Sequence, residues 1–304
     1  MRNSMTGFKA SIVVIITLMV PGLVRAQTNR TWVSGVGDDV NPNCSRTAPC
    51  KTFPGAMTRT NMGGEISCID SGTFGVVVIN KSLTIDTTSC SPVVVSPATN
   101  GITVNITAGA DTAKTVRIRG LSLNGIGTGI NGIKVVAAAS VYIEDVVIDG
   151  FTNHGIQVEA PVGTVFVKNT TIRNVVKSGI NVEPSASAVG PVLWIERTSL
   201  LNSFTGLSVG NGVRATIRDS DIIRHKTGVL AEKGELNVVN CLFTANSAAV
   251  MARGGSVIRL SFATVIHNDA GLVPLDGGKI ISFRNNVVHG NGQDGAPTQS
   301  VPPV

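Results

Sequence analysis

The stretch NGIKVVAAASVYIEDVVIDGF, residues 131–151, contains two runs in which apolar side chains alternate with polar ones, separated by small residues. Alternation with a period of two is typical of β-strands. The same unit recurs to the end of the chain, marked by a small residue followed by an apolar one. It appears 21 to 27 residues apart at Gly132, Gly155, Gly179, Gly206, Gly228, Ala249 and Gly271. A period in this range indicates a solenoid.

Each repeat holds about three short strands and no segment of helical length. A short strand buries its apolar face only when it stacks on its counterpart in the next repeat. The sequence therefore predicts an all-β fold, a single-stranded parallel β-helix of about ten coils with strands about 4.8 Å apart. Leucine-rich repeats have a similar period, but their signature requires leucines at fixed spacing. The inward positions here are mostly Ile and Val, which favour strands.

Aligning the repeats predicts the register of the coils. An inward apolar column contains Ile143, Val167, Ile195, Ile217, Val238, Leu260 and Phe283. The next column, Glu144, Lys168, Glu196 and Arg218, alternates in charge, so we expect attraction between adjacent strands. The position after it is rich in residues that tolerate corner conformations, namely Asp145, Asn169, Arg197, Asp219, Asn240, Phe262 and Asn285.

Residues 1–26 have the features of a secretory signal peptide: basic residues, a short apolar run, and a small residue, Ala26, at the end. We therefore expect a secreted or periplasmic protein. Removing Arg2, Lys9 and Arg25 from the 25 basic residues leaves 22 against 19 acidic residues, a net charge of +3. This balance does not favour nucleic-acid binding. No later apolar stretch reaches the length of a membrane span.

The mature chain divides into three parts. Residues 27–64 lack the repeat, and we expect them to form an N-terminal cap with a strand, a disulfide loop and a short capping helix within KTFPGAMTRTN, because an uncovered strand edge invites aggregation. Residues 65–291 form the predicted β-helix domain. Residues 292–304 are rich in Pro and Gly, and we expect a disordered C-terminal tail.

Five cysteines in an exported chain permit disulfides. Cys44 and Cys50 bracket a short polar loop, and Cys68 and Cys90 lie one repeat apart, so we predict these two pairs and a free Cys241. Zinc binding is the rival interpretation of the first four cysteines, but no CxxC pair occurs. We expect no metal and no cofactor.

The coil pattern over residues 65–291 resembles the pectin-lyase-like right-handed parallel β-helix superfamily. A closer resemblance, to exported bacterial right-handed β-helix repeat proteins, is carried by the segment NPNCSRTAPCKTF and the segment GGEISCIDSGTFGVVVINKSLTI that follows it. The resemblance implies the fold, whereas function depends on the site.

The strongest candidate site is a column of aromatic residues one position before the inward column. Tyr142, Phe166 and Trp194 are expected to point outward on three successive coils, with Arg117 in the same register before them. Flat aromatic surfaces bind sugar rings or protein partners. The competing interpretation is that the loop PSASAVGP, residues 184–191, folds over the rings and covers them.

A second candidate is the carboxylate pair Glu159 and Glu183 on adjacent coils. In pectate lyases of this superfamily, acidic residues on one outer face hold calcium. A hard cation requires six or more oxygen ligands, and we find no third carboxylate beside the pair, so two solvated glutamates are the simpler interpretation.

The sequence leaves two functions open. The first is an exported protein that binds a polysaccharide or a cell-surface protein through a side face of the solenoid. The alternative is a polysaccharide-acting enzyme of pectate-lyase type with a non-standard active site, and only this alternative would require Ca²⁺. Of the polygalacturonase motifs, only Arg224-His225-Lys226 matches by letters, so no catalytic residues are assigned.

Overall fold

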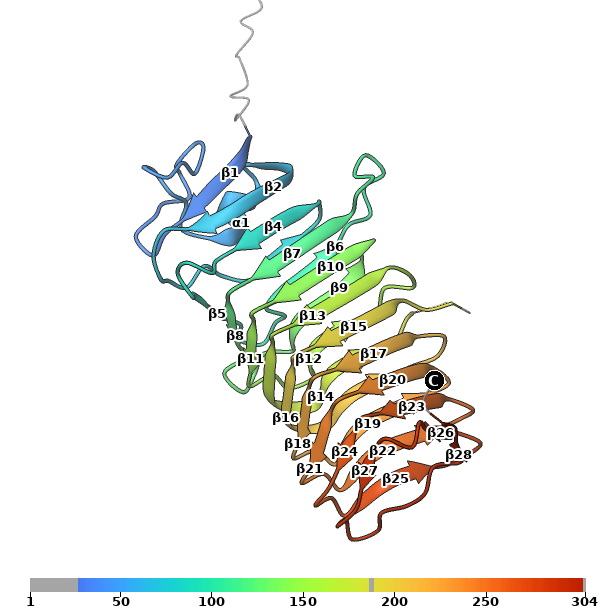
Figure 1. The fold of residues 1–304 in the computed structure, drawn as a ribbon. Helices are drawn as coiled ribbons and strands as arrows, with labels where there is room; N and C mark the ends of the chain where they lie inside the picture. Colours follow the sequence, from blue (N-terminus) through green and yellow to red (C-terminus); the bar gives the residue numbers. More distant parts are fainter. Residues whose placement is uncertain (1–26, 186–188, 303–304) are drawn as a thin grey trace, which may run out of the picture.

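The computed structural model describes residues 27–185 and 189–302. The chain forms a parallel β-solenoid of about nine turns with almost no helix (Figure 1). The sequence predicted about ten coils. The coils differ in length; for example, Leu83 pairs with Val116, 33 residues later. The predicted signal peptide, residues 1–26, lies outside the described residues.

The first side of the solenoid is a 12-stranded sheet that runs its whole length, and we call its outward surface the twelve-strand face (Figure 1). Its strands, in order, are β1 (Thr28–Val33), β2 (Thr60–Cys68), β4 (Leu83–Asp86), β7 (Thr115–Arg119), β10 (Ser140–Glu144), β13 (Thr164–Lys168), β15 (Val192–Glu196), β17 (Arg214–Arg218), β20 (Glu235–Val239), β23 (Val257–Ser261), β26 (Lys279–Ser282) and β28 (Gln299–Ser300).

The other two sides belong to one 16-stranded sheet, because β14 (Thr171–Val182) and β16 (Ser199–Val209) bend around the corner between them. One side also contains β5 (Val93–Val95), β8 (Ser122–Asn124), β11 (Val147–Asp149), β18 (Asp221–Ile223), β21 (Leu242–Thr244), β24 (Thr264–Val265) and β27 (Val287–Val288). The other contains β3 (Val77–Ile79), β6 (Ile102–Asn105), β9 (Asn131–Ala137), β12 (His154–Val158), β19 (Thr227–Glu232), β22 (Ala248–Arg253) and β25 (Ala270–Pro274).

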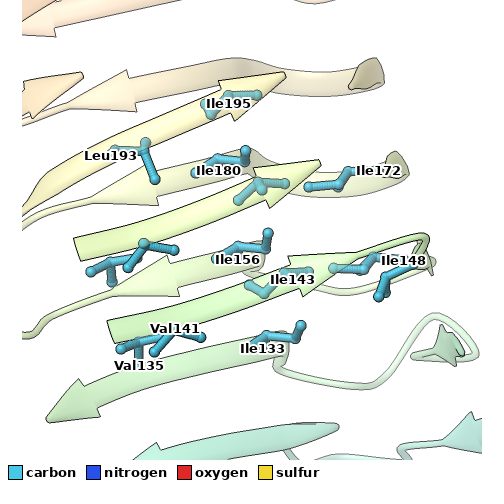
Figure 2. Packing of buried hydrophobic residues seen from close by; sticks show 14 of the residues in the cluster. Ile133, Val135, Val141, Ile143, Ile148, Ile156, Ile172, Ile180, Leu193 and Ile195 are labelled. Atoms are coloured by element: carbon cyan, nitrogen blue, oxygen red, sulfur yellow. The ribbon is translucent and has the colours of Figure 1, made fainter. Parts of the chain in front are cut away.

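The predicted register is confirmed along most of the twelve-strand face. Ile143 pairs with Val167, which pairs with Ile195, and the side chains of this column are buried. The last member is wrong, because Leu260 pairs with Ser282 and Phe283 follows one residue later. Apolar residues from all three sides meet in one continuous interior (Figure 2).

Steric crowding explains why glycine recurs at one position of the repeat. A Cβ atom on Gly155 would lie 2.3 Å from Ile172 Cγ2 and 2.6 Å from the carbonyl oxygen of Gly179 on the next coil. The predicted corner residues from Asp145 to Phe262 adopt the left-handed conformation, with φ between 48° and 56°. Asn and Asp tolerate this conformation best, which explains their abundance at the corner.

A line of polar side chains crosses four coils, and we call it the asparagine ladder: His225, Asn246, Asn268 and Asn291. The first three are buried and Asn291 is partly buried. The side-chain Oδ1 of Asn246 accepts a hydrogen bond from the backbone N–H of His225 at 2.9 Å, and Asn268 and Asn291 repeat this bond one coil later each. The Nδ2 groups donate to strand carbonyls, for example from Asn268 to Phe243. The ladder satisfies corner backbone groups that are buried away from water.

Both ends of the domain differ in part from expectation. The predicted boundary at residue 64 falls inside β2, which pairs with β1, so the first strand already belongs to the sheet. The helix α1 (Phe53–Met57) is a single short turn with Thr52 as its N-cap; its role as a cap over the solenoid stays a prediction.

Residues 292–302, which we expected to be disordered, are instead paired with the last coils. β28 pairs with β26, and Gln293 forms a parallel bridge with Ala270. Asp294 accepts hydrogen bonds from the backbone N–H and the side chain of Asn291, which hold the pKa of its carboxyl below the usual value. Strand pairing and the end of the asparagine ladder together hold this Gly- and Pro-rich segment on the solenoid.

Candidate functional site

The aromatic strip, which we define as Tyr142, Phe166 and Trp194, lies on the twelve-strand face. Tyr142 pairs with Phe166 and Phe166 with Trp194 on the adjacent strands β10, β13 and β15. The neighbours of each residue along the strand point into the core, so the strip points outward. The rings of Tyr142 and Phe166 are stacked, with centroids 4.7 Å apart and planes 3° apart.

A guanidinium extends the strip on one side. Arg117 pairs with Tyr142 in the register of β7 and β10, and its Cζ lies 4.5 Å from the centroid of the Tyr142 ring. Its Nη1 also lies 3.7 Å from Oε2 of Glu144. The contact is a cation–π interaction, and it holds Arg117 at the edge of the rings.

The exposed end of the strip is Trp194. Its side chain is 46 % exposed, whereas Tyr142 and Phe166 are half-buried against their neighbours. The loop expected as an alternative cover includes residues 186–188, which lie outside the described residues. The indole of Trp194 therefore provides the largest accessible aromatic surface of the strip.

A column of charges runs beside the strip, but its ion pairs differ from the predicted ones. Glu144, Lys168, Glu196 and Arg218 do align on adjacent strands. Their ion pairs, however, join Glu144 to Arg119 at 3.1 Å, Glu196 to Arg197, and Arg218 to Asp219 at 2.9 Å. Hydrogen bonds from Asn240 and Arg218 keep the pKa of Asp219 below its usual value. Arg119 is the residue opposite Glu144 on the preceding strand, so this pair continues the charged column by one coil. Glu196 and Arg218 are instead paired with the corner residues that follow them, Arg197 and Asp219.

The carboxylate pair lies on a different side of the solenoid. Val158 pairs with Val182, so Glu159 and Glu183 follow each other on adjacent coils as expected. Glu159 is held by Lys134, with Nζ 3.0 Å from Oε1. Within residues 27–185 and 189–302, no group of three or more His, Cys, Asp or Glu could hold a metal ion. The ammonium group of Lys134 therefore neutralises one member of the pair.

Both predicted disulfides are present. Cys44 is bonded to Cys50 and Cys68 to Cys90, with Cα–Cα distances of 4.8 and 6.2 Å. Cys241 is a free, buried cysteine, and burial raises the pKa of its thiol to about 12, which makes it unreactive.

The comparisons with known proteins concern the fold. The family model described as "Right handed beta helix region" matches residues 193–300. A pectate lyase, Pel9A, aligns with a TM-score of 0.50 and 14 % identity over 88 % of this chain and 74 % of the lyase. The A-module of a mannuronan C-5 epimerase from Azotobacter vinelandii, AlgE6, aligns with a TM-score of 0.44 and 12 % identity over 90 % of this chain and 87 % of the module.

The chain folds as a right-handed parallel β-helix, as pectate lyase Pel9A does, which confirms the fold that the resemblance implied. No curated protein matches the chain in sequence. At 14 % identity the likeness to the lyase concerns the fold alone, so function has to be argued from the side chains of this chain. The described residues include no helix that is long and apolar enough to cross a membrane.

Proposed function

We propose that this protein acts outside the cytoplasm and binds glycan chains through the aromatic strip on its twelve-strand face. The observation that carries the proposal is the 46 % exposed indole of Trp194, in register with two stacked aromatic rings. A sugar ring offers C–H groups on its faces and hydroxyls at its edge. A flat indole with polar neighbours is complementary to both.

A glycan fits this surface better than a protein partner does. The apolar surface is a single column of three rings, whereas stable protein interfaces bury about 800 Å² on each partner. The same column continues into polar residues, Thr216 and Asn237, and the parallel column carries Glu144 and Lys168. These side chains supply hydrogen-bond donors and acceptors along the path of an extended chain.

Export is part of the proposal. The two disulfides support it, because disulfides persist in oxidising compartments and are rare in the cytosol. The predicted signal peptide and the predicted capping role of α1 are consistent with a protein that must stay soluble outside the cell.

Catalysis on a polysaccharide is the second candidate function. The fold likeness to a pectate lyase is the observation that favours it. If the chain were a lyase, incubation with polygalacturonate and Ca²⁺ would release unsaturated products. Binding without product release would support the binding proposal over this candidate.

Replacing Trp194 with Ala is expected to weaken glycan binding about fivefold or more, because loss of a stacked aromatic at an interface costs about 1 kcal/mol or more. The melting temperature should hardly change, since the ring lies outside the core and nearly half of the residue is exposed. Retention on a panel of immobilised polysaccharides and thermal unfolding would measure the two effects.

The matched control is Phe204→Ala, which removes a 55 % exposed ring on β16, away from the twelve-strand face. The control should bind like the unmodified protein. A large loss of stability in Trp194→Ala with unchanged binding would contradict the proposal and favour a structural role for the ring.

A further inference from the structure

A second aromatic residue lies at the N-terminal end of the twelve-strand face. Trp32 on β1 is partly exposed, and the Cζ atoms of Arg30 and Arg46 lie 4.5 and 5.2 Å from the centroid of its ring. These two contacts are separate from the aromatic strip, because Trp32 lies on β1 and the strip begins on β10. The sequence pattern did not reveal this site, since β1 precedes the repeats.

The disulfide loop holds Arg46 beside the ring. The backbone N–H of Trp32 donates to the carbonyl of Cys44 at 2.7 Å, and the N–H of Cys50 donates to the carbonyl of Trp32 at 2.9 Å. With Cys44 and Cys50 also bonded to each other, the loop that carries Arg46 is tied to β1 on both sides. A side chain positioned by a closed loop loses less conformational entropy when it binds a ligand.

The surface beside Trp32 is hollowed. The hollow has a volume of about 380 Å³, and its lining includes Trp32, Arg30, Arg46 and the hydroxyl-bearing residues Ser67, Thr88 and Ser89. It combines an aromatic wall, hydroxyl groups and guanidinium groups, a set that suits a polar ligand with an apolar face.

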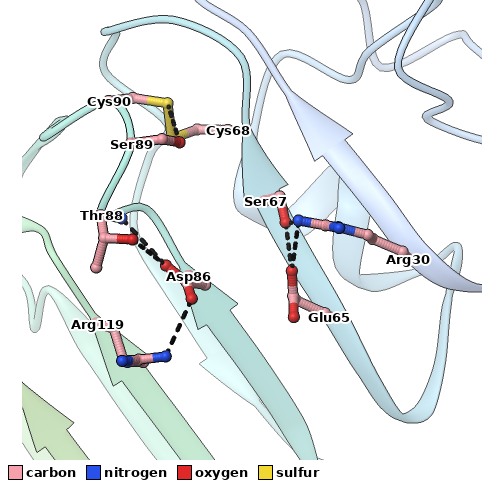
Figure 3. Close-up of polar contacts among 9 residues, drawn as sticks. All are labelled: Arg30, Glu65, Ser67, Cys68, Asp86, Thr88, Ser89, Cys90 and Arg119. Carbon is pink, nitrogen blue, oxygen red and sulfur yellow. Dashed lines mark hydrogen bonds and ion pairs between the residues drawn. A yellow bond between two sulfur atoms is a disulfide. The ribbon is translucent and has the colours of Figure 1, made fainter.

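The uncompensated charge of the hollow is positive. Asp86, the carboxylate in the lining, is already engaged by Arg119 at 3.2 Å and by the Thr88 hydroxyl at 2.7 Å (Figure 3). Glu65, which lies next to the hollow, is engaged by Arg30 at 3.0 Å and by the Ser67 hydroxyl at 2.6 Å. In the part of the chain that the structure describes, no ion pair joins Arg46 to a carboxylate. Its planar guanidinium is suited to bidentate binding of an anion.

We infer that this hollow, the Trp32–Arg46 site, binds a carboxylate or sulfate group of an acidic glycan whose other units lie on the aromatic strip. The inference rests on the proposed function and names the class of glycan. The strand register connects the hollow to the strip. From Trp32, one column runs across the adjacent strands through Ser67, Asp86, Arg119 and Glu144. Glu144 lies on the same face of β10 as Tyr142, the first residue of the strip. From β1 to β15 there are six strand steps, about 29 Å at 4.8 Å each, so the ligand is an extended chain along the solenoid axis.

Arg46→Ala is the direct test, with Lys177→Ala as a control that removes one exposed positive charge from another side of the solenoid. The probes are polygalacturonate, heparin and neutral dextran, so that carboxylate and sulfate sources are separated. We expect Arg46→Ala to bind at least one acidic chain about tenfold more weakly, with a smaller salt dependence and unchanged binding of the neutral chain. Lys177→Ala should bind like the unmodified protein, and thermal unfolding of each variant verifies folding.

The outcomes separate this inference from the proposed function. Equal binding by Arg46→Ala and Lys177→Ala, with weaker binding by Trp194→Ala, would overturn the Trp32–Arg46 site and leave the aromatic strip as the binding surface. Loss of binding in Arg46→Ala with no loss in Trp194→Ala would overturn the single extended ligand and the proposed role of the strip. An acidic peptide that competes as well as the polysaccharide would overturn the assignment to a glycan.

Discussion

Replacing Phe243 with Ala is expected to lower the free energy of unfolding by about 3–5 kcal/mol. Phe243 is fully buried on β21, between Ile222 on the preceding coil and Val265 on the following one. Each coil packs mainly on its two neighbours, so few side chains are available to fill the space that the ring leaves. The substitution is therefore expected to leave a cavity between Ile222 and Val265, where the side chains of successive coils otherwise stack without a gap.

Denaturant titration of Phe243→Ala would measure this effect, with Phe204→Ala as the control for loss of an exposed ring. The control should change the free energy of unfolding by less than about 0.5 kcal/mol. A cost below about 1 kcal/mol for Phe243→Ala would mean that the interior of the solenoid is not packed as described.

Replacing Asn268 with Leu is expected to cost about 3 kcal/mol, although Leu has a similar size and is more apolar. The side chain accepts hydrogen bonds from the backbone N–H and the Nδ2 of Asn246 and donates to the carbonyl oxygen of Phe243. Without it, the buried N–H of Asn246 loses its partner, and the Phe243 carbonyl keeps only the hydrogen bond from the N–H of Ile266. An unsatisfied buried group costs about 1–3 kcal/mol, and the loss of a further hydrogen bond costs about 1 kcal/mol.

The control for the asparagine ladder is Asn237→Ala on the twelve-strand face, where the side chain makes one long bond of 3.4 Å to Thr216. Denaturant titration should show a change below about 0.5 kcal/mol for this variant. Equal effects of Asn268→Leu and Asn237→Ala would contradict a structural role for the ladder.

The sequence predicted the coils well, because the alternation of apolar and polar residues and the need for a small residue at one position recur within each repeat. The inward column from Ile143 to Leu260 and the outward positions of Tyr142, Phe166 and Trp194 follow from the period alone. The asparagine ladder also has a signature in the sequence, because Asn246, Asn268 and Asn291 recur at the repeat spacing. Its meaning depends on burial, which the spacing does not reveal.

The ends of the domain were harder to predict, because they interact with coils that are distant in sequence. Asp294 lies in a segment whose composition predicts disorder, but hydrogen bonds from Asn291 and from the backbone N–H of Leu272 hold it against the last coils. Trp32 similarly gains one of its two arginine neighbours, Arg46, from a disulfide loop that closes back onto β1. The ion pairs of the charged column also depend on which long side chain reaches which partner, and alignment does not encode that.

The central claim, that the twelve-strand face binds glycan, is tested most directly by tryptophan fluorescence. The sequence has two tryptophans, Trp32 and Trp194, and both lie on this face. In Trp32→Phe the emission reports on Trp194 alone, and in Trp194→Phe on Trp32 alone. Titration of Trp32→Phe with neutral, carboxylated and sulfated polysaccharides is predicted to give a saturable change in emission with at least one of them. Emission of Trp194 that stays constant with every polysaccharide would contradict the account.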